Sequence, residues 1–185
     1  DIQLFVENAT RRGIPVMIEA KGSKGKLEKL AKDGSIVGIA YYECDGKPNK
    51  DGVPTRLKGE PNYSAIKDFA VNGAVHYGNA ILNEGTYSEV IVIGINGTTL
   101  NSDGSVADAE CKAYYLSTKN SLIPKAIDKI TATDWSLLKA ENTDKLFDML
   151  DKLNLTDKEL EALTRKTEET LEEKNVAKDK RRRKS

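Results

Sequence analysis

The chain has 185 residues, of which 38% are hydrophobic and 31% are charged. This length and composition fit one α/β domain with an additional segment. The sequence has no apolar run of the roughly 18 residues that a transmembrane helix needs, and no signal-peptide pattern. We therefore expect a protein that does not contact a membrane and is located in the cytoplasm.

The residue types restrict the available chemistry. His76 is the one histidine, and the cysteines, Cys44 and Cys111, are far apart without a C-x-x-C spacing. Zinc hydrolases and hydrolases with Ser/His or Cys/His centres use histidine as a ligand or a base. Carboxylate and lysine chemistry is what remains.

Charge is distributed unevenly. Residues 178–185 contain six basic residues and one acidic residue, a charge of +5, so the rest of this formally neutral chain carries −5. Affinity for duplex DNA comes mostly from basic side chains on phosphates. We expect any such grip to lie largely in other parts of a longer parent protein, because the sequence opens at Asp1, directly inside an apparent strand.

The first part of the chain predicts a β-hairpin and then less regular structure. Alternating apolar residues over 2–7 and an apolar run over 14–20 predict its two strands. A Lys-rich segment, 22–34, places Leu27, Leu30 and Ala31 at helical spacing, and a short apolar run follows at 36–42. Residues 43–62 are rich in Gly, Pro, Asn and Lys, which predicts a mobile loop.

The second part predicts a helix, a central strand and a hairpin. Residues 63–82 have the spacing of an amphipathic helix, in which Gly73 and Gly78 indicate close packing. The continuous apolar run 89–95 predicts a central strand, and the NSDG turn at 101–104 leads into a second hairpin. Short helices should follow residue 131, and Thr156 has capping-box spacing to a glutamate three residues on.

The candidate site lies where the first hairpin ends. Glu19 and Lys21 point to the same face of a strand because side chains alternate with period two. A turn near residues 10–12 pairs positions whose numbers sum to about 21–23, which sets Asp1 opposite residues 20–22. The fold of the hairpin is therefore expected to bring two carboxylates and an ammonium together.

These groups suit phosphodiester hydrolysis. Asp1 and Glu19 can supply oxygen ligands to Mg²⁺, the backbone carbonyl of Ala20 is a candidate third ligand, and Lys21 can orient water or stabilise the transition state. The E-x-K triplet alone carries little weight, since it occurs three times, at Glu19, Glu110 and Glu172. The alternative interpretation is a solvated strand end.

An Asp that opens one strand of a hairpin and an E-x-K that closes the next resemble the PD-(D/E)xK nuclease superfamily. The segments GIPVMIEAKG, NYSAIKDFAVNGAVHYGNAI and EVIVIGING resemble the amino-terminal nuclease domain of type IIG-like restriction-modification enzymes, which are related to type I R subunits. The resemblance covers about residues 1–175. It implies an α/β restriction-endonuclease-like core, with a central mixed sheet flanked by helices and a C-terminal helical extension.

The resemblance also implies function. Asp1 and Glu19 carry over as metal ligands and Lys21 as the catalytic lysine of an enzyme that hydrolyses double-stranded DNA with Mg²⁺, or with Mn²⁺ in its place. A fused or associated adenine-N6 DNA methyltransferase and a specificity module are the implied partners. We expect a nuclease core at residues 1–130 and a helical connector at 131–185.

Two departures accompany the resemblance. Neither the proline that often precedes the Asp nor an upstream helix is present in this sequence. Relatives often carry a Q-x-x-x-Y element on the helix, where this chain has Gly73 and Tyr77. Asn72, His76 and Tyr77 are candidate accessory residues, although such polar residues are more often structural.

Further candidates for DNA contact are Lys24 and Lys26, although a Lys-rich face is usually just solvated. Two alternatives to a restriction nuclease stay open. One is a catalytically silent DNA-binding or interaction module with the same fold, and the other is a nuclease of DNA repair or junction resolution. Binding of duplex without cleavage would favour the silent module.

Overall fold

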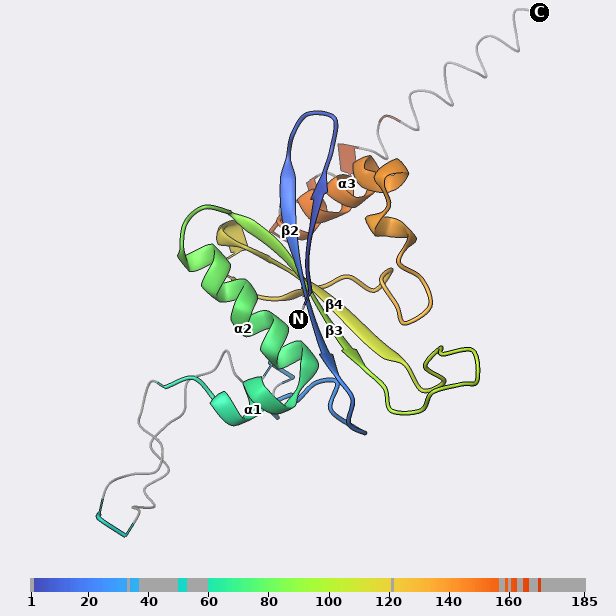
Figure 1. Cartoon of the computed structure of the whole chain (residues 1–185). Helices are drawn as coiled ribbons and strands as arrows, with labels where there is room; N and C mark the ends of the chain where they lie inside the picture. The colour runs from blue at the N-terminus through green and yellow to red at the C-terminus, as the bar shows by residue number, and fades with distance from the viewer. Residues whose placement is uncertain are drawn as a thin grey trace, which may run out of the picture. The chain divides into compact units, whose positions relative to one another are not determined.

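The computed structural model describes residues 2–32, 34–36, 50–52, 60–120 and 122–156, together with 159, 161, 162, 165, 166 and 170. Contacts divide the chain into two units, residues 1–146 and 147–185. The predicted α/β class is confirmed, with a five-stranded mixed sheet, flanking helices and a C-terminal helix (Figure 1). Within the described residues, none of the helices has the length and apolar character that crossing a membrane requires.

The sheet has the strand order β1-β2-β3-β4-β5. The parallel pair β2 and β3 lies near its centre, and all other neighbouring pairs are antiparallel. The strands are β1 (Ile2–Glu7), β2 (Gly13–Lys21), β3 (Glu89–Asn96), β4 (Glu110–Ser117) and β5 (Lys125–Ala126). Both predicted hairpins and the central position of the 89–95 strand are therefore confirmed.

The register of the first hairpin differs from the predicted one. Ile2 pairs with Ile18 and Glu7 with Gly13, so paired numbers sum to 20 rather than to 21–23. The turn explains this register. The Asn8 side chain accepts a hydrogen bond from the Arg12 backbone N–H at 2.9 Å, which closes the turn over residues 8–12 and pairs Glu7 with Gly13. Arg11 takes a positive φ of 61° inside this turn.

The connection from β2 to β3 contains α1 (Tyr63–Asp68) and α2 (Ala70–Asn83) rather than the single helix predicted for 63–82. The break is at Phe69, whose backbone is extended. The first N–H groups of a helix lack partners inside that helix. Here the N–H groups of Ala70 and Val71 donate to the carbonyls of Lys26 and Leu27, at 2.9 and 2.8 Å.

The segment 22–32, for which the leucine spacing indicated a helix, has no helical residues. The backbone carbonyls of Lys26 and Leu27 accept hydrogen bonds from N–H groups at the start of α2, whereas in a helix they would accept from N–H groups four residues further along the same segment. Gly25 has a φ of 69°, which right-handed helix does not permit. We call residues 26–29 the strap, because they are tied across the start of α2. The predictions for the 36–42 strand and the 43–62 loop fall largely outside the described residues.

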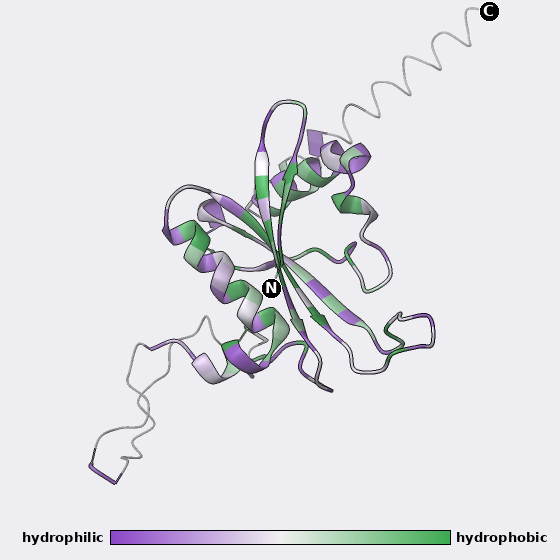
Figure 2. Cartoon of the chain, in the orientation of Figure 1, coloured by the Kyte–Doolittle hydropathy of each residue, from purple (hydrophilic) through white to green (hydrophobic). Residues whose placement is uncertain are grey.

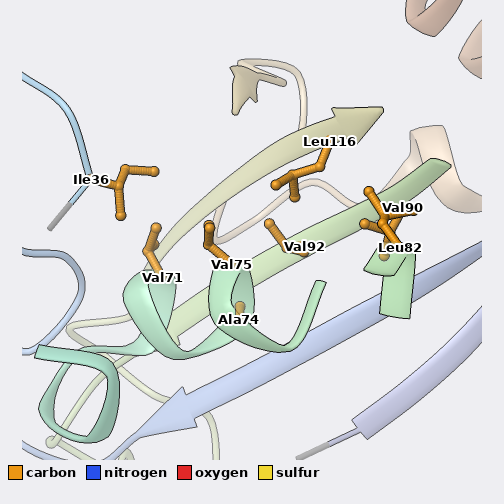
Figure 3. Close-up of a cluster of buried hydrophobic side chains, with 8 residues drawn as sticks. All are labelled: Ile36, Val71, Ala74, Val75, Leu82, Val90, Val92 and Leu116. Atoms are coloured by element: carbon orange, nitrogen blue, oxygen red, sulfur yellow. The ribbon is translucent and has the colours of Figure 1, made fainter. Parts of the chain in front are cut away.

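The helix α2 covers one face of the sheet, where a buried apolar cluster joins it to β3 and β4. Figure 3 shows Val71 and Val75 of α2 beside Val92 of β3 and Leu116 of β4. Side chains on the other face, such as Ile91 and Ile93, are also buried. Burial on both faces explains the continuous apolar sequence of β3. In contrast, β4 carries alternating hydrophilic and hydrophobic bands (Figure 2).

The two glycines of α2 pack closely, as predicted. A Cβ at Gly78 would lie 2.6 Å from Cγ1 of Val92, and one at Gly73 would lie 2.9 Å from the Ile66 carbonyl oxygen. Gly94 of β3 lies under Val71 in the same way. These contacts allow α2 to pack closely on the sheet near the end of β2.

Beyond the sheet the described elements are short 3₁₀ helices and α3 (Thr143–Leu153), as the sequence texture predicted. The 3₁₀ helices are η1 (Thr118–Asn120), η2 (Ser136–Leu138) and η3 (Ala140–Asn142). The predicted capping box is confirmed, since the backbone N–H and the hydroxyl of Thr156 both donate to Glu159 and the Glu159 N–H donates to Thr156 Oγ1. These bonds lower the pKa of Glu159.

Candidate active site

The E-x-K pair of β2 is assembled as its strand geometry requires. Glu19 and Lys21 project to the face that α2 covers, because Glu19 is the cross-strand partner of Gly94, which lies under Val71. Lys21 Nζ donates to Glu19 Oε1 at 2.5 Å. Asp1, the predicted second carboxylate, lies outside the described residues.

Glu19 is a buried carboxylate with one free oxygen. The residue is 6% exposed, and its Oε2 has no hydrogen-bond partner among the residues that the structure describes. Burial of an ionised carboxylate is costly unless its oxygens are paired. The unpartnered oxygen is therefore the atom of this site that most needs a ligand.

Gly73 of α2 packs directly against the Glu19 side chain. A Cβ at Gly73 of α2 would lie 3.3 Å from Glu19 Cγ and 3.4 Å from its Cδ. In this chain the room that a larger side chain would occupy is taken by Glu19 itself, so Gly73 permits the carboxylate to stay under the helix.

The side chain of Asn72 hydrogen-bonds to the backbone of the strap. Asn72 is 1% exposed; its Oδ1 accepts from the Lys29 N–H at 2.9 Å, and its Nδ2 donates to the Lys29 carbonyl at 3.0 Å. This pair of bonds reproduces the pairing of a β-ladder. We assign Asn72 to the positioning of the strap.

His76 and Tyr77 belong to an aromatic group that includes Tyr63. The His76 ring centroid lies 5.7 Å from that of Tyr77 and 6.2 Å from that of Tyr63, in edge-to-face orientations. Tyr63 and Tyr77 are 59% and 42% exposed. His76 and Tyr77 follow Gly73 by three and four residues on α2, and Tyr63 begins α1, so the aromatic group joins the two helices.

The two lysines suggested for DNA contact differ in their surroundings. Lys24 is exposed. Lys26 Nζ lies 3.5 Å from an Asp68 carboxylate oxygen and 4.8 Å from the centroid of the Phe69 ring. Lys26 is therefore partly engaged within the protein, and Lys24 is the freer of the two.

Two polar residues at this end of the sheet were not among the predicted site residues. Asn96, the last residue of β3, is 2% exposed and donates from Nδ2 to Glu110 Oε2 at 3.1 Å. Glu110 opens β4 and belongs to the second E-x-K triplet. The signal that marks Asn96 in the sequence is a polar residue that ends a run of buried apolar ones.

The second E-x-K triplet does not reproduce the geometry of the first. Lys112 forms an ion pair with Glu28, which also accepts a hydrogen bond from the Tyr114 hydroxyl at 2.9 Å. Together with burial, Glu28 raises the pKa of Tyr114, because a carboxylate disfavours the phenolate. The lysine and glutamate of this triplet therefore have different partners, whereas those of the first bind each other.

Across the described ranges, no group of three or more His, Cys, Asp or Glu side chains could hold a metal ion. A magnesium site here would combine Glu19 with backbone or amide oxygens and water, which is the usual manner in which proteins bind Mg²⁺. No known protein family, curated protein sequence or solved structure matches the chain. A functional assignment must therefore rest on the residues themselves.

Proposed function

We propose that this chain carries the catalytic centre of a Mg²⁺-dependent endodeoxyribonuclease of a restriction-modification enzyme. The observation that supports the proposal is the Glu19 carboxylate, buried beneath α2 with Oε2 unpartnered and with Lys21 at 2.5 Å from Oε1. Most buried side-chain polar atoms in proteins are hydrogen-bonded, so an unpartnered oxygen on a buried carboxylate is unusual.

The residues present fit a hard cation. Glu19 Oε2 and the carbonyl oxygen of Ala20 would hold Mg²⁺, which usually keeps several waters and binds through one or two carboxylates. When bound, the cation neutralises the charge that develops on phosphate oxygens and lowers the pKa of coordinated water. The resemblance to PD-(D/E)xK nucleases adds Asp1 to this set.

Lys21 has a distinct role in the proposed reaction. Its side chain is 24% exposed while the ammonium is bound to Glu19. The ammonium orients the attacking water and stabilises the negative charge of the phosphorane-like transition state. Water adds to phosphorus, the bond to the leaving deoxyribose oxygen breaks and that oxygen takes up a proton, so the reaction consumes one water for each strand cut.

The test is nicking of supercoiled plasmid by the chain with Mg²⁺ or Mn²⁺, compared with Lys21→Ala. We expect nicking that Lys21→Ala lowers by at least about 10²-fold, the usual effect of losing one transition-state contact. Lys112→Ala is the matched control, because it alters the other described E-x-K triplet, and it should cut at the wild-type rate. Equal nicking by wild type and Lys21→Ala, or none by wild type, would refute the proposal.

A further inference from the structure

Asn96 is a second buried polar residue whose hydrogen bonds are incomplete. It is 2% exposed, Nδ2 donates to Glu110, and Oδ1 has no hydrogen-bond partner within the described part of the chain. An unpaired buried acceptor costs about 1–3 kcal/mol. Most buried polar atoms in proteins are paired, so this oxygen requires an explanation.

The position of Asn96 places it beside the site. Asn96 is the cross-strand partner of Lys21 on one side and of Glu110 on the other. Glu19 is two residues before Lys21, so its side chain shares the same face. With strands about 4.8 Å apart and a rise of about 3.3 Å per residue, the Cα atoms of Glu19 and Asn96 are roughly 8 Å apart.

The hydrogen bond to Glu110 fixes which end of the Asn96 carboxamide faces β4. A carboxylate accepts hydrogen bonds only, so Nδ2 rather than Oδ1 must turn toward Glu110 on β4. This bond leaves Oδ1 unpaired among the described residues, on a residue whose cross-strand partner on β2 is Lys21. Two buried and unpartnered oxygens, Glu19 Oε2 and Asn96 Oδ1, thus occur on one face at the same end of the sheet.

We propose that Asn96 Oδ1 is a neutral oxygen ligand of the divalent cation at Glu19, and that Glu110 is a positioning residue which fixes the carboxamide. The inference rests on the proposed function and extends its ligand set to β3. Asparagine carbonyl oxygens are ordinary ligands of hard cations. Ligand orientation by a hydrogen-bonded carboxylate is a recurring feature of metal sites.

The test measures binding of Mn²⁺ alone to the whole chain, by electron paramagnetic resonance of the free ion, without DNA. We expect Asn96→Ala to weaken Mn²⁺ affinity by about tenfold or more. Glu110→Ala should weaken it by about tenfold, the lower end of the 10–100-fold that outer partners of metal ligands contribute. Glu110→Gln should retain affinity, because its amide oxygen still accepts from Asn96 Nδ2.

Two controls separate this inference from the proposed function. Asn79→Ala removes another amide whose buried Oδ1 lacks a partner, on α2, and it should bind Mn²⁺ as wild type does. Glu19→Ala should abolish binding. If Glu19→Ala loses Mn²⁺ while Asn96→Ala binds it normally, the role of Asn96 is refuted and the site at Glu19 stands.

If Glu19→Ala binds Mn²⁺ as tightly as wild type, or wild type binds none at millimolar concentration, the metal site itself is refuted. Thermal unfolding of the metal-free variants verifies that each is folded. Should Asn96→Ala not fold, Asn96→Ser takes its place, because the shorter hydroxyl can still donate to Glu110 but cannot reach the cation. The two outcomes keep the same meaning.

Discussion

Two glutamates show how differently this sheet treats a carboxylate at its two ends. Glu89 opens β3 and accepts from Arg12 Nε at 3.1 Å, from Arg12 Nη2 at 2.5 Å and from the Tyr115 hydroxyl at 2.5 Å. Among the described residues, Glu19, near the end of β2, accepts a hydrogen bond from Lys21 alone and keeps Oε2 without a partner. Glu89 is satisfied by the protein, which is how a structural carboxylate is expected to be.

The comparison teaches that hydrogen-bond completeness separates the two roles better than burial does. The side chains of Glu19 and Glu89 are 8% and 16% exposed, so both are largely withdrawn from water. What differs is the number of donors that the fold supplies. Substitutions at the two ends should therefore affect different properties, stability at one and chemistry at the other.

The largest effect is expected for Glu19→Gln, which keeps the shape of the side chain and removes its charge. Cleavage of plasmid should fall by roughly 10³-fold because the cation loses its carboxylate. The free energy of unfolding should not decrease, since a buried charge with an unpartnered oxygen is removed. Initial nicking rates and urea unfolding measure both. A stable variant that still cuts would remove the distinction between the two glutamates.

Arg12→Ala should instead lower the free energy of unfolding, by about 2 kcal/mol, because Glu89 loses its charged donors. Mn²⁺ affinity should not change. Arg12→Lys should fall between wild type and Arg12→Ala, since lysine keeps the charge but not the two-pronged geometry. Urea denaturation of the three proteins provides the measurement. Wild-type stability of Arg12→Ala would show that the Glu89 end contributes little.

Gly73→Ala tests the Glu19 end of the sheet through the helix that packs over it. The new Cβ would meet the Ile66 carbonyl oxygen at 2.9 Å and Glu19 Cγ at 3.3 Å, so we expect a loss of about 1–3 kcal/mol and a weaker Mn²⁺ site. Gly22→Ala is the matched control, because a Cβ there has nothing within 4 Å. Thermal unfolding with and without Mn²⁺ distinguishes them. Similar behaviour of the two variants would contradict the close packing at Gly73.

The smallest effect concerns Asp108, an exposed carboxylate that is fully supplied with donors. Bonds from the Thr98 hydroxyl and from the Thr99 and Thr98 N–H groups lower its pKa. Because the folded pKa lies below the unfolded one, the stabilisation is present above about pH 4 and is lost as pH falls through the lowered pKa. Thr98→Val should raise the pKa of Asp108 toward its ordinary value in an NMR titration, whereas Thr98→Ser should not.

Local patterns predicted the elements whose structure depends on local burial. The apolar runs of β2 and β3 and the alternation of β1 identify buried and half-buried strands directly. The pairing of Glu19 with Lys21 follows from strand periodicity alone. These features depend on one or two neighbouring elements, which the sequence displays.

Features set by distant partners were missed. The helical spacing of Leu27 and Leu30 indicated a helix in the segment that contains the strap. The strap carbonyls instead accept hydrogen bonds from α2, about forty residues further along the chain. The break at Phe69 has the same cause. Asn96 was not singled out because its meaning depends on Glu110 and Lys21 on the adjacent strands. Hydrogen bonds between segments that are far apart in the chain produce no periodic pattern in the sequence.

The adjacent residues Asn72 and Gly73 have a mechanical consequence. Asn72 clamps the strap through the Lys29 backbone, while Gly73 rests on the Glu19 side chain. A single turn of helix therefore links the segment that carries Lys24 and Lys26 to the buried carboxylate. Any displacement of this turn of α2 would therefore change both the position of the strap backbone and the packing over the Glu19 side chain.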